Sequence, residues 1–419
     1  MTHDTNIPQG YKATALGIIP QEWEVVRFGK VMKCFSGGTP KSSNPDFFGG
    51  KIPFIKSGEI HLSTTEQNLS EEGLNQSAAK MVNKGDLLYA LYGANSGDCA
   101  ISKIEGAINQ AILCIRTDAF DIPYLLAVLE LNRPYYTDVY LQGGQGNLSA
   151  EIVKSYMIAV PPLAEQRKIA EVLGVWDEAI EKQARLIEKL ALRKRALMQR
   201  ILSAKLRLPG FSEPWKKVKL GEIGHFLSSN TLSRDCLNEQ NGNIKNIHYG
   251  DILIKLPTIV DASFIHIPYI NDDVIVKSDY LKNGDIIFAD TAEDYTVGKA
   301  IEIINIQAIP ITSGLHTIPF RPKSGIFVNR FLGYYVNSTD YRRQLQPLIQ
   351  GIKVYSISKT ALCKTTLKIP TLFEQTAIAE VLTAADREIE LAKEKLERLR
   401  RQKRGLMQQL LTGKKRVKY

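Results

Sequence analysis

The feature that most constrains this 419-residue chain is an internal repeat. The segment PPLAEQRKIAEVL begins at Pro161, and a related segment, PTLFEQTAIAEVL, begins at Pro370. Glu165 matches Glu374, which is an offset of 209 positions, and the match continues without a gap as far as Gln408. A gapless match of that length indicates one structural element that is present twice.

A weaker similarity precedes each copy at an offset of 192. Trp23 matches Trp215 at this offset, and the segment Ile55–Ile60 aligns with Ile247–Ile252. Around these positions the two halves differ strongly, so the chain is organised as a variable domain and a shared helix, each present twice. The predicted boundaries are residues 1–160 and 208–368 for the domains, and 161–207 and 369–419 for the helices, the last with a basic tail.

The shared element has the sequence pattern of a long helix. Each copy follows a proline, Pro162 or Pro370, and is rich in Ala, Leu, Glu, Lys and Arg, which favour helices. Apolar residues recur at steps of four and three, which is the heptad pattern of a coiled coil. Gln183, Lys194 and Lys403 interrupt this pattern, as polar residues that set the register of a coiled coil often do. The predicted coiled-coil residues are Ile169, Leu173, Trp176, Ile180, Ile187, Leu190, Leu197, Ile378, Leu382, Ile389, Leu396, Leu399 and Leu406.

A single stretch of this kind would be read as an ordinary amphipathic helix against a globular core. Two copies in one register, with Lys194 and Lys403 aligned, favour pairing with each other in antiparallel fashion. Roughly forty helical residues span about 60 Å, so such a rod would hold two domains apart. The expected fold class is therefore α+β: two mixed α/β domains joined by two long helices in an antiparallel coiled coil, with pseudo-twofold repetition.

The variable halves show many short strands. Alternating or β-branched runs bounded by glycine occur at 51–55, 86–90 and 301–304. The segments Tyr124–Leu131 and Phe331–Val336 are predicted to be short amphipathic helices late in each half.

Composition limits the class of partner. Hydrophobic residues make up 44% and charged residues 23%, which is typical of a globular protein, and the formal net charge is +10. This charge favours polyanionic partners. Acidic lipids would also satisfy it, but no run of about 18 apolar residues predicts a transmembrane span.

The expected compartment is cytoplasmic. Met1–Gln9 lacks the apolar core of a signal peptide. The five cysteines form no CxxC pair and the six histidines are dispersed, so neither a disulfide framework nor a metal site is predicted.

Motifs for catalysis are missing from the sequence. No Asp or Glu is followed two positions later by Lys, as the common restriction-nuclease metal site requires. The phosphate loop GxxxxGK[ST] and the motifs GxSxG and HExxH do not occur either. Val160-Pro161-Pro162-Leu163 superficially resembles a methyltransferase (N/D)PP(Y/F) loop, but Val160 cannot bind an amino group and Leu163 cannot stack as an aromatic ring does.

Polar, glycine-rich segments are the candidates for DNA recognition, since reading DNA requires cations for phosphates, and donors and acceptors for base edges. Each loop alone could be only a solvated turn. Their occurrence at matching places in both halves, beside the repeated helix, strengthens the prediction. The candidate residues are Thr39, Lys41, Ser42, Lys56, Ser57, Glu59, Tyr92, Asn95, Ser96, Asn109, Gln110, Gln142, Gln145 and Asn147 in the first half, and Ser229, Asn230, Arg234, His248, Tyr249, Asp294, Tyr295, His316, Lys353 and Tyr355 in the second.

The carboxyl-terminal parts of the two helices are basic. Between Arg185 and Arg207 in the first copy, and between Lys393 and Arg416 in the second, Lys and Arg cluster. A solvated face that complements the helix dipole explains such clusters, and so do contacts with phosphates or with an acidic partner.

Taken together, these segments resemble the specificity subunits of type I restriction-modification enzymes. The resemblance rests on SGGTP at Ser36 with the following FFGGKIPFIKSGEI, KGDLLYALYG, QGGQGNLS and the duplicated helix start, and it covers essentially the whole chain. It implies two target recognition domains that read a bipartite sequence in double-stranded DNA. It also implies a coiled coil that sets their spacing and binds two methylation subunits.

By the same resemblance, this chain is a non-catalytic subunit without cofactors of its own. S-adenosylmethionine would belong to the methylation subunits, and ATP and magnesium to the motor-nuclease restriction subunits. The second half departs from the family pattern, because Ser228–Leu232 replaces the SGGTP loop and His248 replaces the cation at Lys56. A coiled-coil scaffold that binds no nucleic acid, and a self-sufficient methyltransferase or nuclease, are the alternative functions.

Overall fold

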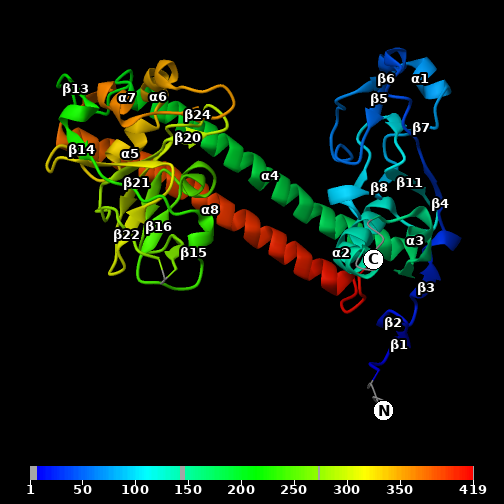
Figure 1. The fold of residues 1–419 in the computed structure, drawn as a ribbon. Helices are drawn as coiled ribbons and strands as arrows, with labels where there is room; N and C mark the ends of the chain where they lie inside the picture. Colours follow the sequence, from blue (N-terminus) through cyan, green and yellow to red (C-terminus); the bar gives the residue numbers. More distant parts are fainter. Residues whose placement is uncertain (1–6, 142–146, 272–273, 419) are drawn as a thin grey trace. The chain divides into compact units, whose positions relative to one another are not determined.

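The computed structural model describes residues 7–141, 147–271 and 274–418 (Figure 1). The chain divides into two compact units. Unit 1 consists of Met1–Ala184 and Glu394–Tyr419, and unit 2 consists of Arg185–Lys393. Each unit contains one mixed α/β body and part of both long helices, α4 (Leu163–Leu202) and α8 (Leu372–Leu410).

The body of unit 1 contains two four-stranded sheets, in the orders β6-β5-β10-β7 and β4-β11-β8-β9, and two two-stranded ribbons, β1-β2 and β12-β3. Short helices α1 (Glu71–Asn75) and α3 (Ala150–Ser155) and the longer α2 accompany them. The strands are β1 (Tyr11–Thr14), β2 (Gly17–Pro20), β3 (Glu24–Arg27), β4 (Lys33–Ser36), β5 (Phe48–Ile55), β6 (Asn68–Leu69), β7 (Lys80–Val82), β8 (Leu87–Ala90), β9 (Cys99–Ile101), β10 (Gly106–Ile108), β11 (Ile112–Arg116) and β12 (Met157–Val160).

The body of unit 2 repeats this plan with sheets ordered β14-β23-β19-β21-β17 and β15-β18-β16-β22, and ribbons β13-β25 and β20-β24. Its short helices are α5 (Phe331–Val336), α6 (Thr339–Leu345) and α7 (Lys359–Lys364). The strands are β13 (Lys216–Lys219), β14 (Gly224–Phe226), β15 (Leu237–Asn238), β16 (Lys245–Ile247), β17 (Ile259–Asp261), β18 (Tyr269–Ile270), β19 (Ile286–Ala289), β20 (Thr291–Ala292), β21 (Ala300–Ile304), β22 (Ile311–Ser313), β23 (Thr317–Pro322), β24 (Tyr355–Ser356) and β25 (Thr366–Ile369).

In each body, one parallel strand pair determines where the candidate loops meet; unit 2 also contains a second parallel pair, β17 and β21. In unit 1, β5 and β10 run parallel, with Ile55 opposite Ile108. In unit 2, β16 and β22 run parallel, with Ile247 opposite Ser313. Because parallel strands end at the same edge of a sheet, the residues that follow each strand of a pair lie next to each other.

The predicted helix Tyr124–Leu131 is part of a longer element, α2 (Ile122–Leu141). The predicted segment ended before Pro134, and the structure continues the helix through this proline, which lacks a backbone donor. The Thr137 hydroxyl donates to the carbonyls of Arg133 and Pro134 in this part of the helix. The second predicted helix, Phe331–Val336, agrees with α5.

The two long helices pair in antiparallel fashion within each unit. In unit 1, Asp177 of α4 pairs with Lys403 of α8 at 2.6 Å. In unit 2, the equivalent Lys194 of α4 pairs with Asp386 of α8, and Arg193 of α4 pairs with Glu388. The residue numbers rise along α4 as they fall along α8, which confirms the predicted antiparallel coiled-coil architecture.

The predicted coiled-coil residues are buried or half-buried within their units, while the residues between them are mostly exposed. Ile169, Leu173, Ile378 and Leu382 are at most 2% exposed. The two lysines that interrupt the heptad pattern have partners of opposite charge in the facing helix. These pairs specify a register that an unbroken apolar surface would not.

The long helices are shorter than the predicted spans 161–207 and 369–419. Helix α4 begins at Leu163, directly after Pro161-Pro162, and ends at Leu202. Helix α8 begins at Leu372 and ends at Leu410. Beyond these ends, the backbone turns into the left-handed region at Ala204 and Gly413, with φ of 60° and 71°. A left-handed residue just after the last turn is a common way to end a helix.

A buried carboxylate at the start of each long helix joins three parts of its unit. In unit 2, Glu374 accepts two hydrogen bonds from Arg207, at 2.7 and 2.8 Å, and one from the Trp215 indole at 3.0 Å. In unit 1, Glu165 accepts two from Arg416, at 2.5 and 2.9 Å, and one from the Trp23 indole at 2.9 Å. We call each set a Glu-Arg-Trp clamp.

The glutamine after each clamp glutamate binds the backbone of the segment that precedes a helix of the body, α2 in unit 1 and α5 in unit 2. Gln166 accepts from the backbone N–H of Asp121 and donates to the carbonyls of Ala119 and Pro161. Gln375 makes the same three bonds in unit 2, with Val328, Ile326 and Pro370. The repeated Glu-Gln pair therefore attaches each body to its helices by buried polar contacts.

Replacing Arg207 with methionine should destabilise unit 2 strongly. The Glu374 side chain is 2% exposed, so the variant leaves a buried carboxylate without its counter-charge. We expect the free energy of unfolding in urea to fall by about 3 kcal/mol. The exposed Lys205→Met in the same segment should change it little. A loss below about 1 kcal/mol would mean that the clamp behaves like a surface ion pair.

Unit 2 also contains a buried carboxylate within its sheet. Glu302 of β21 accepts hydrogen bonds from the backbone N–H groups of Arg330 and Gly333 at the start of α5. Arg330, at the N-cap, has φ of 78° and makes no side-chain cap. Burial raises the pKa of Glu302 from 4.5 to about 7, although the bonds from Arg330 and Gly333 lower it in part.

Unit 2 should therefore lose stability as the pH rises from about 4.5 to about 7. In this range the folded state binds more protons at Glu302 than the unfolded state does, so the free energy of unfolding falls with pH. The shift corresponds to a loss on the order of 3 kcal/mol. Urea denaturation at several pH values should show that Glu302→Gln flattens this part of the profile. An identical profile in the variant would contradict the assignment.

Candidate nucleic-acid interface

The candidate residues of unit 1 lie at the edge where β5 and β10 end. Lys56 and Ser57 follow β5, and Asn109 and Gln110 follow β10, so the parallel pair brings these four residues together. The loop after β8 reaches the same edge, because the Leu91 N–H donates to the carbonyl of Ala111 at 2.8 Å.

The glycine-rich loop after β4 packs against this edge. The Thr39 hydroxyl donates to the Gln110 side-chain oxygen at 2.6 Å, and both residues are exposed. A Cβ on Gly37 would lie 1.7 Å from the carbonyl oxygen of Ile108, so only glycine fits there. Lys41 and Ser42 extend from the same loop into solvent.

The turn after β5 is held by its own carboxylate. Glu59 accepts from the backbone N–H groups of Lys56 and Glu66, at 3.0 and 2.8 Å. The Lys56 ammonium lies 3.6 Å from Glu66, which is largely exposed. Glu59 therefore shapes the turn, and Lys56 retains only a weak surface partner.

The loop after β8 presents Tyr92 and Asn95. Tyr92 is 36% exposed, and the Asn95 amide lies 3.6 Å from the position of a Cβ on Gly58. Ser96 is buried, and its hydroxyl donates to the carbonyls of Leu91 and Gly93 within the loop. Ser96 thus shapes this loop, whereas the exposed Tyr92 lies on its surface.

Asn147 lies next to the loop after β8. The Leu148 N–H donates to the carbonyl of Leu91 at 3.0 Å, and the neighbouring Asn147 is exposed. Gln142 and Gln145 lie outside the described residues.

In unit 2, the equivalent edge carries a histidine and tyrosine cluster. His248 follows β16, and His316 lies three residues after β22. The ring of Tyr249 lies between them, with centroids 4.6 Å from His248 and 5.3 Å from His316. His316 is exposed, with Nδ1 3.2 Å from the Thr291 hydroxyl and 3.3 Å from Asp290.

Asn230 and Arg234 have partners within unit 2. The Asn230 amide is buried and donates to Asn246 at 2.8 Å and to Thr312 at 3.2 Å. Arg234 makes two bonds with the buried carboxylate of Asp251, at 2.9 and 3.1 Å. Burial, and then the positive charge of Arg234, lower the pKa of the His248 imidazole, which favours its neutral form.

Four of the remaining candidates, Asp294, Tyr295, Lys353 and Tyr355, lie in or near the ribbon β20-β24. The rings of Tyr295 and Tyr355 stack with centroids 4.8 Å apart, and Tyr295 is 65% exposed. Asp294 accepts from the backbone N–H and the hydroxyl of Thr296, so it caps its own turn and its pKa is lowered by these bonds. Lys353 is exposed in the loop before β24, and Ser229 is half-buried.

The sequence did not identify the partners of several basic residues in the long helices and in the segments that follow them. Arg193, Lys194, Lys403, Arg207 and Arg416 all form ion pairs within their own units. These ion pairs give the residues a role in the coiled coil and its clamps, and the interpretation as contacts with phosphates or a partner stays a prediction. The repeat contained the signal, because Arg207 and Arg416 share the offset of Glu165 and Glu374.

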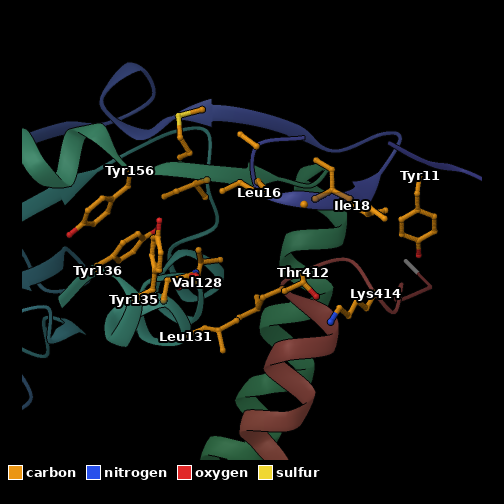
Figure 2. A pocket seen from close by; sticks show the side chains of 18 of the residues that line it. Tyr11, Leu16, Ile18, Val128, Leu131, Tyr135, Tyr136, Tyr156, Thr412 and Lys414 are labelled. Carbon is orange, nitrogen blue, oxygen red and sulfur yellow. Dashed lines mark hydrogen bonds between the residues drawn. The ribbon is translucent and has the colours of Figure 1, made fainter. Parts of the chain in front are cut away.

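The cavity in unit 1 shown in Figure 2 has a volume of about 950 Å³ and lies elsewhere. It is bordered by the ribbon β1-β2, by α2, by β12 and by the residues after α8. Its lining contains tyrosines, such as Tyr135 and Tyr156, aliphatic residues and Lys414, but none of the candidate interface residues. The candidate interface is thus a surface of loops rather than an enclosed pocket.

The described residues contain no group of three or more His, Cys, Asp or Glu residues that could hold a metal ion. No helix among them is long and apolar enough to span a membrane.

Comparison with known proteins identifies the family. The family model for the type I restriction modification DNA specificity domain matches twice, at residues 20–191 and 212–401. The MjaVIII specificity subunit of a type I restriction enzyme from Methanocaldococcus jannaschii is 26% identical, over 96% of this chain and 94% of its own length.

Two solved structures share the fold. A chain from a study of complex assembly and conformational transition of the type I R-M system has a TM-score of 0.60 at 19% identity, over 94% of this chain and 99% of that one. The S subunit of a type I restriction-modification system from M. genitalium has a TM-score of 0.51 at 15% identity, over 93% and 96%. With two copies of the specificity domain across most of its length, the chain belongs to the DNA specificity subunits of type I restriction-modification systems.

Proposed function

We propose that each unit reads one half of a bipartite DNA sequence through the loops at the edge of its parallel strand pair. The observation that carries this proposal is that the same edge is built twice with different side chains. Unit 1 presents Thr39, Gln110 and Tyr92, whereas unit 2 presents His316, Tyr249 and Tyr295. Two unlike reading surfaces on one plan suit a target with two unlike halves.

The exposed side chains divide into two kinds of contact. Lys41 and Lys353 are cations suited to phosphates, which give affinity without sequence preference. Gln110 and Asn147 have amides that can bind base edges in the major groove, adenine above all. The exposed ring nitrogen of His316 can donate to or accept from a base edge in unit 2.

We further propose that this chain is a non-catalytic subunit. Its sequence contains neither the nuclease, methyltransferase nor phosphate-loop motifs that such chemistry requires. S-adenosylmethionine would then be bound by two methylation subunits, and ATP and magnesium by motor-nuclease restriction subunits. The specificity subunit would direct adenine methylation and restriction by those partners in the cytoplasm.

Exchanging residues 20–160 for the same region of a relative tests the division of labour. In the complex assembled with its methylation subunits, the change should alter one half of the methylated sequence and leave the other unchanged. Mapping of methylated adenines would show this directly. A change in both halves would contradict independent reading by the two units.

Single substitutions test the reading edge itself. Gln110→Ala should reduce discrimination at one base pair of one half-site by about tenfold or more, because a base contact contributes about 1–3 kcal/mol. Gln76→Ala is the matched control, because Gln76 is an exposed glutamine directly after α1 that bonds to Glu72. Equal discrimination by the variant and the control would remove Gln110 from the interface.

A second candidate function is a coiled-coil scaffold that binds no nucleic acid, which the ion-paired register of α4 and α8 would also support. Salt dependence separates the two. For the complex, log affinity for DNA should fall linearly with log salt, and Lys41→Gln should reduce the slope by about one unit. Lys103→Gln, in the turn between β9 and β10, should not change it. Absence of DNA binding by the complex would favour the scaffold.

A further inference from the structure

Each unit contains one loop with the same unusual backbone geometry at its candidate reading edge. In unit 1, the loop between β8 and β9 ends at Gly97, with φ of 77°. In unit 2, the loop between β19 and β21 ends at Gly298, with φ of 76°. The N–H of each glycine donates to the last residue of the preceding strand, Ala90 at 2.9 Å or Ala289 at 2.8 Å. The two loops are therefore closed in the same way.

An arginine from a helix binds the loop of unit 1 through its backbone. The Nε of Arg133 on α2 donates to the carbonyl of Ser96, the residue before Gly97, at 3.2 Å. Its Nη1 lies 3.3 Å from Asp98, which also lies 3.0 Å from His61. A Cβ on Gly97 would lie only 3.1 Å from the Arg133 side chain, so the contact is close.

Arg342 on α6 makes the corresponding contact in unit 2. Its Nη2 donates to the carbonyl of Val297, the residue before Gly298, at 2.9 Å, and to the carbonyl of Tyr295 at 2.7 Å. Arg342 is half-buried, and burial lowers the pKa of its guanidinium. Arg133 and Arg342 lie 209 positions apart, the same offset as the helical repeat.

We propose that Arg133 and Arg342 are positioning residues that hold the two DNA-reading loops in their binding conformation. The loops present the exposed rings of Tyr92 and Tyr295, and a left-handed glycine next to each held carbonyl would otherwise give the chain a point of rotation. Hydrogen bonds from a charged donor to these carbonyls restrain backbone rotation at the two glycines. The inference rests on the proposed function, because it assigns these loops to DNA reading.

The role differs from general stabilisation of the fold. Arg133 binds one carbonyl and one carboxylate, both at the loop, and Arg342 binds two loop carbonyls. Loss of either guanidinium should therefore loosen one loop in one unit. Bound DNA would then have to order that loop, which reduces both affinity and selectivity.

The first experiment follows the loops without DNA. Hydrogen exchange on the full chain should show that Arg133→Met accelerates exchange at 91–98 and not at 290–299, and that Arg342→Met does the opposite. Arg343→Met is the matched control, because Arg343 is the next residue on α6, is 63% exposed and pairs with Asp340. Exchange that rises throughout a unit, or not at all, would overturn the proposal.

The second experiment measures methylation by the assembled complex on sites altered in either half. Arg133→Met should reduce discrimination by about tenfold or more in the half-site read by unit 1 only, and Arg342→Met in the other only. Arg133→Lys should retain part of the discrimination that Arg133→Met loses, since lysine keeps a charged donor. Gly97→Ala, which strains the left-handed position, gives a second variant if Arg133→Met fails to fold, and should relax the same half-site.

The outcomes separate this proposal from the proposed function. If the wild-type complex shows no half-site discrimination, the proposed function fails. If the wild-type complex discriminates and the arginine variants keep that discrimination in both halves, the positioning role fails while the proposed function stands.

Discussion

The architecture depends on a buried carboxylate at the start of each long helix. Glu165 and Glu374 each accept two hydrogen bonds from an arginine beyond the end of the facing helix and one from a tryptophan of the body. Burying such a carboxylate without its partners would cost several kcal/mol, so the contacts restrict how helix and body can join. The clamp therefore connects the register of the coiled coil to the position of each α/β body within its unit.

In each body, a parallel strand pair then determines which loop residues become neighbours at the candidate edge. Because β5 and β10 end at one edge, residues far apart in sequence, such as Lys56 and Gln110, become neighbours. In unit 2, the pair β16 and β22 brings His248 close to His316 by the same logic. The same topology supports amides and a threonine in one unit and imidazoles and tyrosines in the other. The sheets therefore determine where the candidate edge lies, and the loops determine which side chains it presents.

Sequence reasoning predicted the repeated elements well, because the repeat and the heptads are local patterns. The antiparallel pairing of the long helices and the helix Phe331–Val336 were predicted correctly, and the loops of the candidate edge stay a prediction. It could not assign partners that depend on tertiary contacts. Asn230 and Arg234 have the composition of DNA-binding residues, yet their side chains bond to Asn246 and Asp251 within unit 2. The sequence alone does not show whether a polar residue in a glycine-rich loop forms hydrogen bonds within the protein or contacts a ligand.

The contacts of Arg133 and Arg342 with the two loops are also tertiary contacts that the sequence did not predict. They suggest why the sequences of the two loops can differ. Arg133 and Arg342 bind backbone carbonyls, of Ser96 and Val297, and a carbonyl is present whatever the side chain. A polar and an apolar residue can therefore occupy the held position without loss of the contact. This contact therefore constrains one glycine and one distant arginine, while side chains such as Ser96 and Asp294 shape the rest of each loop in their own way. In the proposed function, the exposed residues of each loop can then differ with the bases that the unit reads.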